Sequence, residues 1–358
     1  MAVDGVPGIA DGPALARWLH ENDIATGQPL DHVELIAGGR SNLTYRLDLG
    51  PVRVVLRRPP LGHVLPTAHD MSREFRVLSA LSGTDIPVPE PLANCTDSDV
   101  IGTPFYLMEF VDGAVLRTRE DGEQLTPDQG RQLSERLADM LAAIHRVDIE
   151  GVGLTGFGRP EGYLARQLSR WQRQWELSNT REMPGYNRLV ERLAAGLPAD
   201  SDHTLVHGDY RLDNMLVTLG ATPAVAAVVD WEMSTLGDPL ADLGLTLIYW
   251  ADPDDSQWGD ISIGASVTAG PGFFTRAQVA RRYGDLTGRD LADIGYYMAF
   301  GCFKLAVVLE GIHARFLQKQ TVGEGFEREG FAVPVLIERA HQMLDAGLPD
   351  LGRAGFRD

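Results

Sequence analysis

The chain has 358 residues, 44% of them hydrophobic and 23% charged, which is enough for two compact domains with buried cores. Its 50 acidic and 32 basic residues give a formal net charge of −18 at pH 7. A negative field of this size repels phosphate backbones, so we expect neither nucleic acid nor an anionic membrane as a partner, whereas a cationic or Mg²⁺-chelated ligand is compatible with it. The acidity is equally compatible with a role in solubility alone.

The cysteine content and the N-terminal residues indicate a cytoplasmic protein. Cys95 and Cys302 are far apart in the sequence and form no CxxC motif, which argues against a disulfide framework and a cysteine-based zinc site. Residues 1–11 lack the basic start and apolar stretch of a signal peptide. Charged residues interrupt each candidate run of eighteen apolar residues, so no membrane span is expected.

The first third of the chain carries strand patterns. Residues 33–36, 43–49 and 52–57 are strand-like, and the last two segments are separated by the turn signal Gly50-Pro51. Strands joined by short turns predict an antiparallel meander.

One helix and one further strand complete this part. Asp70 and Ser72 are suitable N-cap residues for a helix with one apolar face. An apolar strand over 105–111 then ends at an Asp-Gly turn. We place the domain boundary there, giving an N-terminal domain at 1–111 and a C-terminal domain at 112–358.

The C-terminal domain is mainly helical. Apolar residues from Leu133 to Ile144 follow one face of a long helix, and residues 291–318 show mostly helical spacing. Two short apolar strands, 204–206 and 224–229, interrupt the helices. The sequence therefore predicts an α+β fold.

The strongest chemical signal is the segment from His207 to Asn214, His-Gly-Asp-Tyr-Arg-Leu-Asp-Asn, followed by Asp230 at the end of an apolar strand. Phosphoryl transfer requires a carboxylate that accepts the proton of the attacking hydroxyl, which suits Asp209. It also requires hard oxygen ligands for Mg²⁺, which Asn214 and Asp230 supply.

These residues resemble the aminoglycoside phosphotransferase/choline kinase family. The family's catalytic loop H-G-D-x-x-x-x-N matches His207 to Asn214, and its metal-binding Asp matches Asp230. The resemblance implies a two-lobed, protein-kinase-like fold that uses ATP or GTP with Mg²⁺ to phosphorylate a hydroxyl of a small molecule. Protein kinases have related motifs, but Gly208 replaces their Arg and no activation segment follows Asp230.

The resemblance also implies a nucleotide site in the N-terminal domain. A short loop between two strands would approach the phosphates, although such a loop is often only a structural hairpin. The strand end at Glu109 and Val111 resembles the hinge that meets the adenine edge. The predicted loop residues are Gly38, Gly39, Ser41 and Asn42.

One position departs from the usual pattern. Most kinases place Lys on the next strand to hold the phosphates, and here Arg57 takes that position, with Glu74 as the matching helix partner. Arg58 is the rival cation, but successive strand residues face opposite sides, so only one of the two can face the nucleotide. The Arg-Arg-Pro-Pro sequence resembles the family branch found beside acyl-CoA dehydrogenases.

Four other residues allow two interpretations each. Asp242 is expected to brace the catalytic loop rather than touch the substrate. His145 is expected to favour a helix end through its charge rather than to act in catalysis. Lys304 and Arg315 lie on a late helix where the family often lines its acceptor site; they either hold an anionic acceptor or are surface charges, the interpretation we favour.

Two questions stay open at the level of sequence. The Arg57 departure leaves a catalytically silent, nucleotide-binding regulatory domain as the alternative to an enzyme. The acceptor is an aminoglycoside, a hydroxyacyl-type compound or another metabolite. The sequence does not determine the oligomeric state.

Overall fold

The computed structural model describes residues 6–25, 27–36, 42–61, 70–199, 202–252, 267–319, 329–348 and 351. The chain forms two compact units. Unit 1 comprises Met1–Gly113, Val152–Leu154 and Val225–Ser234, and unit 2 comprises Ala114–Gly151, Thr155–Ala224 and Thr235–Asp358. The predicted domain boundary after Val111 stays a prediction. A feature that the sequence did not indicate is the inclusion of the segment bearing Asp230 in unit 1.

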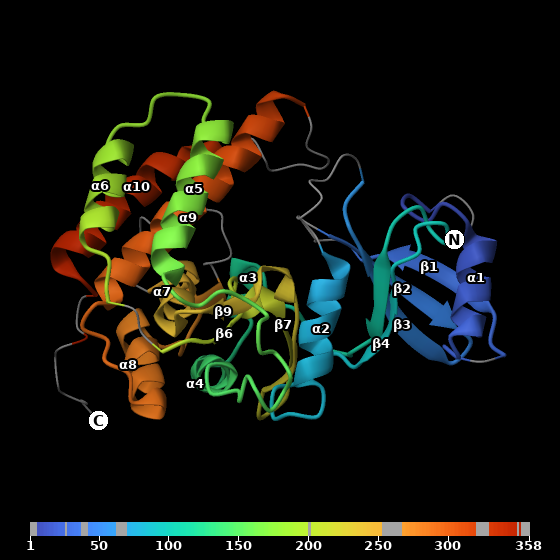
Figure 1. Ribbon diagram of the computed structural model, residues 1–358. Coiled ribbons are helices and arrows are strands. Elements are labelled where there is room, and N and C mark those ends of the chain that lie inside the picture. Colours follow the sequence, from blue (N-terminus) through green and yellow to red (C-terminus); the bar gives the residue numbers. More distant parts are fainter. Residues whose placement is uncertain are drawn as a thin grey trace. The chain divides into compact units, whose positions relative to one another are not determined.

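Unit 1 contains a five-stranded antiparallel sheet in the order β1-β2-β3-β5-β4 (Figure 1). The predicted meander is confirmed as its first three strands. The elements are α1 (Gly12–Glu21), β1 (Leu30–Leu35), β2 (Leu43–Leu49), β3 (Val52–Arg58), α2 (Met71–Leu81), β4 (Pro91–Cys95), β5 (Phe105–Glu109), β8 (Ala224–Val228) and the 3₁₀ helix η2 (Trp231–Met233).

Strand alternation gives this sheet two different faces. Tyr45, Leu47 and Leu56 point to the side of α1 and form the core with Leu15 and Leu19. The opposite face is covered by α2, which packs against β4 and β5 (Figure 1). The predicted cap of α2 is present, because the Asp70 carboxylate accepts from the Arg73 N–H at 3.2 Å. Helix α1 and strand β4 were not predicted.

Helix α2 also carries the contacts that hold the distant segments in unit 1. The Arg73 guanidinium donates to the Ser234 carbonyl at 3.1 Å, and the Arg76 guanidinium donates to the Gly153 carbonyl at 3.1 Å. The segment that follows β8 is therefore fixed to the helix that bears Glu74.

Unit 2 is mainly helical, as predicted. Capping boxes at Thr118, Thr126 and Thr275 begin α3, α4 and α8. The elements are α3 (Arg119–Glu123), α4 (Pro127–Ile144), α5 (Tyr163–Ser178), α6 (Tyr186–Ala195), β6 (Thr204–Val206), η1 (Leu212–Asn214), β7 (Met215–Thr218), β9 (Thr235–Gly237), α7 (Pro239–Tyr249), η3 (Val267–Ala269), α8 (Arg276–Thr287), α9 (Ile294–Leu317) and α10 (Glu329–Ala346). Strands β6 and β9 pair antiparallel.

Helix α9 forms the centre of unit 2. It packs against α5, α7 and α10, and most of its residues are buried (Figure 1). By length and composition alone α9 could cross a membrane, but 78% of its most apolar 18-residue stretch is buried within the structure. Packing inside unit 2 therefore accounts for its hydrophobic character.

Candidate active site

Asp209 and Asn214 belong to unit 2, whereas Arg57, Glu74 and Asp230 belong to unit 1. The magnesium site predicted from Asn214 and Asp230 together therefore stays a prediction.

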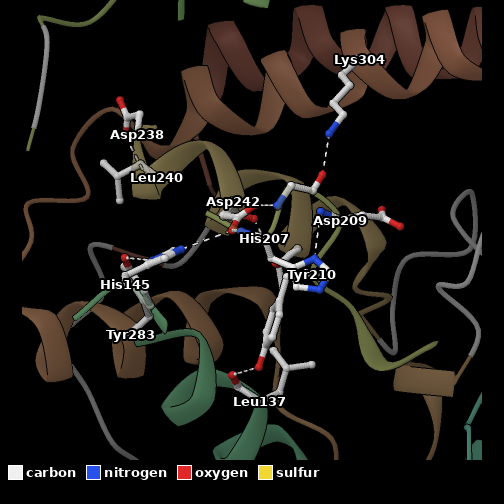
Figure 2. A network of polar contacts seen from close by, with 12 residues as sticks. Leu137, His145, His207, Asp209, Tyr210, Asp238, Leu240, Asp242, Tyr283 and Lys304 are labelled. Atoms are coloured by element: carbon white, nitrogen blue, oxygen red, sulfur yellow. Dashed lines mark hydrogen bonds and ion pairs between the residues drawn. The ribbon is translucent and has the colours of Figure 1, made fainter. Parts of the chain in front are cut away.

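The catalytic loop, defined here as His207 to Asn214, begins with a conformation that requires glycine. Gly208 has φ +84°, in a region that residues with a Cβ rarely adopt. Its N–H donates to Asp242 Oδ1 at 2.7 Å, and the His207 N–H donates to Asp242 Oδ2 at 2.5 Å (Figure 2). The prediction that Asp242 braces the loop is confirmed.

A buried network supports Asp242 in turn. His145 Nε2 lies 3.3 Å from Asp242 Oδ2, and His145 Nδ1 lies 2.7 Å from the Tyr283 hydroxyl (Figure 2). Burial lowers the pKa of His145 although Asp242 acts against that shift, so the ring is neutral near pH 7. Because a carboxylate only accepts, we assign the hydrogen to Nε2, which leaves Nδ1 to accept from Tyr283.

The ionised form of Asp242 is favoured despite its burial. Burial alone would raise the pKa of Asp242, but the His145 ring and the Gly208 amide hold it below its usual value. His145 was expected to act only through its charge at a helix end; it does follow α4, but its ring serves the loop. Its partner lies 97 residues away, so no local pattern could have shown this role.

Replacement of Asp242 by Ala should be strongly destabilising. It would leave two buried backbone N–H groups without their acceptor, at ~1–3 kcal/mol each, so we expect the free energy of unfolding to fall by about 3 kcal/mol or more. Denaturant titration measures this change. The matched control is Asp285→Ala on the exposed side of α8, where we expect a change within ~0.5 kcal/mol. Equal stability of the two variants would contradict the bracing role.

The predicted base Asp209 is held by its own loop. Asn214 Nδ2 donates to the Asp209 carbonyl at 2.7 Å and to Asp209 Oδ2 at 3.0 Å. The Asp209 side chain is 25% exposed, so it remains accessible to a substrate. Because the Asn214 amide nitrogen is engaged, its oxygen is the atom oriented for other ligands.

Two charged residues within the loop were not assigned a role from sequence. Arg211 Nε lies 3.6 Å from Asp209 Oδ2, and Arg211 Nη1 lies 3.7 Å from Asp213 Oδ2. The guanidinium carbon is 4.7 Å from the ring centroid of Tyr249, a cation–π contact. Their places between Asp209 and Asn214 in the motif are the signal that could have indicated them.

Lys304 on α9 is half-buried and its ammonium is bound by the catalytic loop, so the favoured prediction of a simple surface charge does not hold. Its Nζ donates to the Gly208 carbonyl at 2.6 Å (Figure 2). The same Nζ lies 5.6 Å from the ring centroid of Trp171. Burial lowers the pKa of this ammonium, while Asp209 acts in the opposite direction. Arg315 on the same helix is exposed, as predicted for a surface charge.

In unit 1, Arg57 joins two carboxylates. Its Nε lies 3.0 Å from Glu74 Oε2, and its Nη2 donates to Asp230 Oδ1. The predicted contact with Glu74 is confirmed, and the contact with Asp230 is additional. Burial alone would lower the pKa of Arg57, but the two carboxylates raise it well above its usual value. Burial raises the pKa of Glu74 to about 7, with Arg57 opposing the shift.

Arg58 lies on the other face of the sheet, as strand alternation predicted. Its guanidinium donates to the carbonyls of Gly8 and Pro59. Arg57 is therefore the member of the pair that reaches Glu74 and Asp230.

Asp230 adopts a backbone conformation that is unusual for a residue with a side chain. Its φ of 67° and ψ of 55° lie in the left-handed region, where Asp is among the better tolerated residues. Such conformations are often found at functional sites.

The nucleotide-loop prediction is only partly within the described residues. Gly38, Gly39 and Ser41 lie outside them. Asn42 precedes β2, is buried, and donates to Glu232 Oε2 at 2.8 Å, while its side-chain oxygen has no hydrogen-bond partner among the residues that the structure describes. The contact of Asn42 with the nucleotide stays a prediction.

The predicted hinge lies at the end of β5. The Glu109 N–H donates to the Glu90 carbonyl at 2.8 Å, and Val111 follows the strand. Their contact with adenine stays a prediction.

Each unit contains one predicted magnesium ligand with an oxygen atom of a type that Mg²⁺ prefers. Asn214 offers an amide oxygen, and Asp230 offers a carboxylate of which one oxygen is already bound to Arg57. Over the described ranges no group of three or more His, Cys, Asp or Glu residues is arranged to hold a metal. Mg²⁺ differs from zinc in this respect, because it is commonly held by one or two protein oxygens together with substrate phosphates and water.

Comparison with known proteins establishes the class. The model of the phosphotransferase enzyme family matches residues 32–280, and the chain belongs to this family. The fold is accordingly the α+β, kinase-like one that was predicted.

The relatives confirm the predicted branch. Acyl-CoA dehydrogenase family member 10 of Mus musculus is 36% identical over 303 residues, which cover 84% of this chain but 28% of the mouse protein. The chain thus spans less than a third of that relative. A solved structure from Ralstonia eutropha JMP134, provisionally named an aminoglycoside phosphotransferase, has a TM-score of 0.79 at 33% identity and covers 94% of this chain and 98% of its own.

A more distant structure shares the fold alone. A thermostable variant of aminoglycoside phosphotransferase APH(4)-Ia, in a ternary complex with AMP-PNP and hygromycin B, has a TM-score of 0.59 at 14% identity. The match covers 94% of this chain and 99% of that one.

Proposed function

We propose that this protein is a small-molecule kinase that transfers the γ-phosphoryl group of ATP, or of GTP, to an alcohol hydroxyl. The observation that carries the proposal is the catalytic loop, in which Asp242 holds the backbone and Asn214 holds the Asp209 carboxylate while it stays partly exposed. A rigid and accessible carboxylate is what a base for an incoming hydroxyl requires.

Each residue then has a specific task. Asp209 orients the acceptor hydroxyl and takes its proton. Arg57 presents a permanently charged guanidinium, held by its two carboxylate neighbours, to the nucleotide phosphates. Mg²⁺, when bound, neutralises phosphate charge, and Asn214 and Asp230 would hold it.

A catalytically silent nucleotide-binding domain is the second candidate. The observation in its favour is that Arg57 contacts Asp230, the predicted metal ligand, which opposes metal binding unless the contact is exchanged. Retention of the base and both metal ligands favours the enzyme.

For the acceptor we propose a metabolic hydroxy compound, with hydroxyacyl-type molecules tested first. The support is the likeness to acyl-CoA dehydrogenase family members over more than four fifths of this chain. Aminoglycosides are the other class, since these cations suit the charge of −18 and a structural neighbour was solved with hygromycin B.

The test is a screen of alcohols, hydroxyacyl thioesters and aminoglycosides for acceptor-dependent release of ADP or GDP. We expect turnover with one class and its loss when EDTA removes the divalent cation, with restoration by added Mg²⁺. Nucleotide binding by calorimetry without turnover of any acceptor would support the silent domain instead.

A further inference from the structure

Asp242 and Lys304 bind the two polar backbone groups of a single residue of the catalytic loop, Gly208. The Gly208 N–H is bound by Asp242 from α7, and the Gly208 carbonyl is bound by Lys304 from α9 at 2.6 Å (Figure 2). Gly208 has φ +84°, and glycine is the residue with the greatest backbone freedom. Both polar groups of the most adaptable residue in the loop are therefore fixed from outside it.

The carbonyl that Lys304 binds belongs to the peptide that leads into Asp209. A peptide group is planar, so fixing its oxygen also fixes the direction of the Asp209 N–H. That N–H points to His207 Nδ1 at 3.3 Å, a long contact that by itself holds the peptide weakly. The orientation of Asp209 thus depends on a side chain 96 residues away from Gly208 in the sequence.

Packing alone does not explain a cation at this position. The neighbouring residues on α9, including Phe303 and Leu305, are buried and apolar. Burying an ammonium carries a free-energy cost that an apolar side chain would avoid. The Trp171 ring, 5.6 Å from Nζ, offsets part of this cost through a cation–π contact. The negative charges of Asp209 and Asp242 raise the pKa of the ammonium, whereas the positive charge of Arg170 lowers it.

We propose that Lys304 is a positioning residue for Asp209: from α9 it fixes the Gly208–Asp209 peptide and so aims the carboxylate at the acceptor hydroxyl. This inference rests on the proposed phosphotransfer function. It assigns to α9 a direct role in maintaining the geometry of the catalytic loop.

The test compares Lys304→Met, which loses all N–H donors, with Lys304→Gln, which keeps an amide donor for the Gly208 carbonyl. Misplacement of a reacting group by about 1 Å can cost ~10²-fold in rate, so we expect kcat of Lys304→Met to fall ~10- to 10²-fold with KM for the acceptor unchanged. Lys304→Gln should recover part of the loss. The control is Arg315→Met, an exposed cation on the same helix, which should match the wild type.

A double variant separates positioning from other roles. Residues that act as one unit show strongly non-additive effects, so Lys304→Met should cost little further activity when added to Asp209→Asn. A full additional loss would overturn the proposal. A raised KM for the acceptor with unchanged kcat would also overturn it, because Lys304 would then bind the acceptor.

Hydrogen–deuterium exchange provides a readout that does not depend on turnover. We expect faster amide exchange in the catalytic loop of Lys304→Met, with unchanged exchange rates in the rest of the unit and an unchanged melting temperature. If the wild type neither phosphorylates an acceptor nor hydrolyses the nucleotide, the proposed function fails. Unchanged loop exchange in Lys304→Met would show separately that Lys304 does not hold the loop.

Discussion

Asp209→Ala should lower kcat by at least ~10²-fold and leave nucleotide affinity nearly unchanged. The substitution removes the carboxylate that accepts the hydroxyl proton. The backbone should keep its place, because Asp242 and Lys304 hold Gly208, and Asn214 retains its bond to the carbonyl of residue 209 at 2.7 Å. The loss should therefore be chemical rather than structural.

Steady-state kinetics with the best acceptor, together with calorimetric titration of Mg·ATP, measures both parts of this expectation. Asp285→Ala, an exposed carboxylate of α8, is the matched control and should retain wild-type kinetics. Near-normal turnover of Asp209→Ala would remove Asp209 from the role of base.

Arg57→Ala should raise KM for the nucleotide and lower kcat together. A hydrogen bond to a charged group is worth ~1.5–3 kcal/mol, so loss of its phosphate contact should reduce kcat/KM roughly 10- to 10²-fold. The buried carboxylate of Glu74 would also lose the cation that opposes its raised pKa, and we expect it to take up a proton. Arg57→Lys should retain more activity, since the charge survives although the fork geometry is lost.

The contact between Asp230 and Arg57 changes the effect that we expect from replacing Glu74. From sequence, removal of Glu74 would free Arg57 to swing away. The structure shows that Asp230 also holds the guanidinium, so Glu74→Gln should cost less activity than Arg57→Ala. Arg53→Ala, an exposed residue of the same strand paired with Asp112, is the control for loss of a strand cation. Unchanged kinetics in Arg57→Ala would refute its proposed role.

Local patterns predicted much of the fold. Alternation along the strands predicted the meander and the opposite faces of Arg57 and Arg58, because side-chain direction in a strand is fixed by the backbone over two residues. Helical periodicity likewise predicted α4 and α9 of unit 2. Helix α1 and strand β4 were missed; β4 begins at Pro91, and the nearby prolines indicated only a helix break.

The motif from His207 to Asn214, with Asp230, determined the family without any structure, since residue types and spacing suffice for a contiguous loop. The sequence also indicated Asp242 as the brace of that loop, whereas the tertiary structure alone showed the other contacts that hold it. Lys304 reaches it from α9, and His145, directly after α4, supports Asp242. Lys304 comes from a helix buried nearly all round, where periodicity does not distinguish an inward charge from an outward one. Such contacts depend on how distant segments pack, which no local sequence pattern encodes.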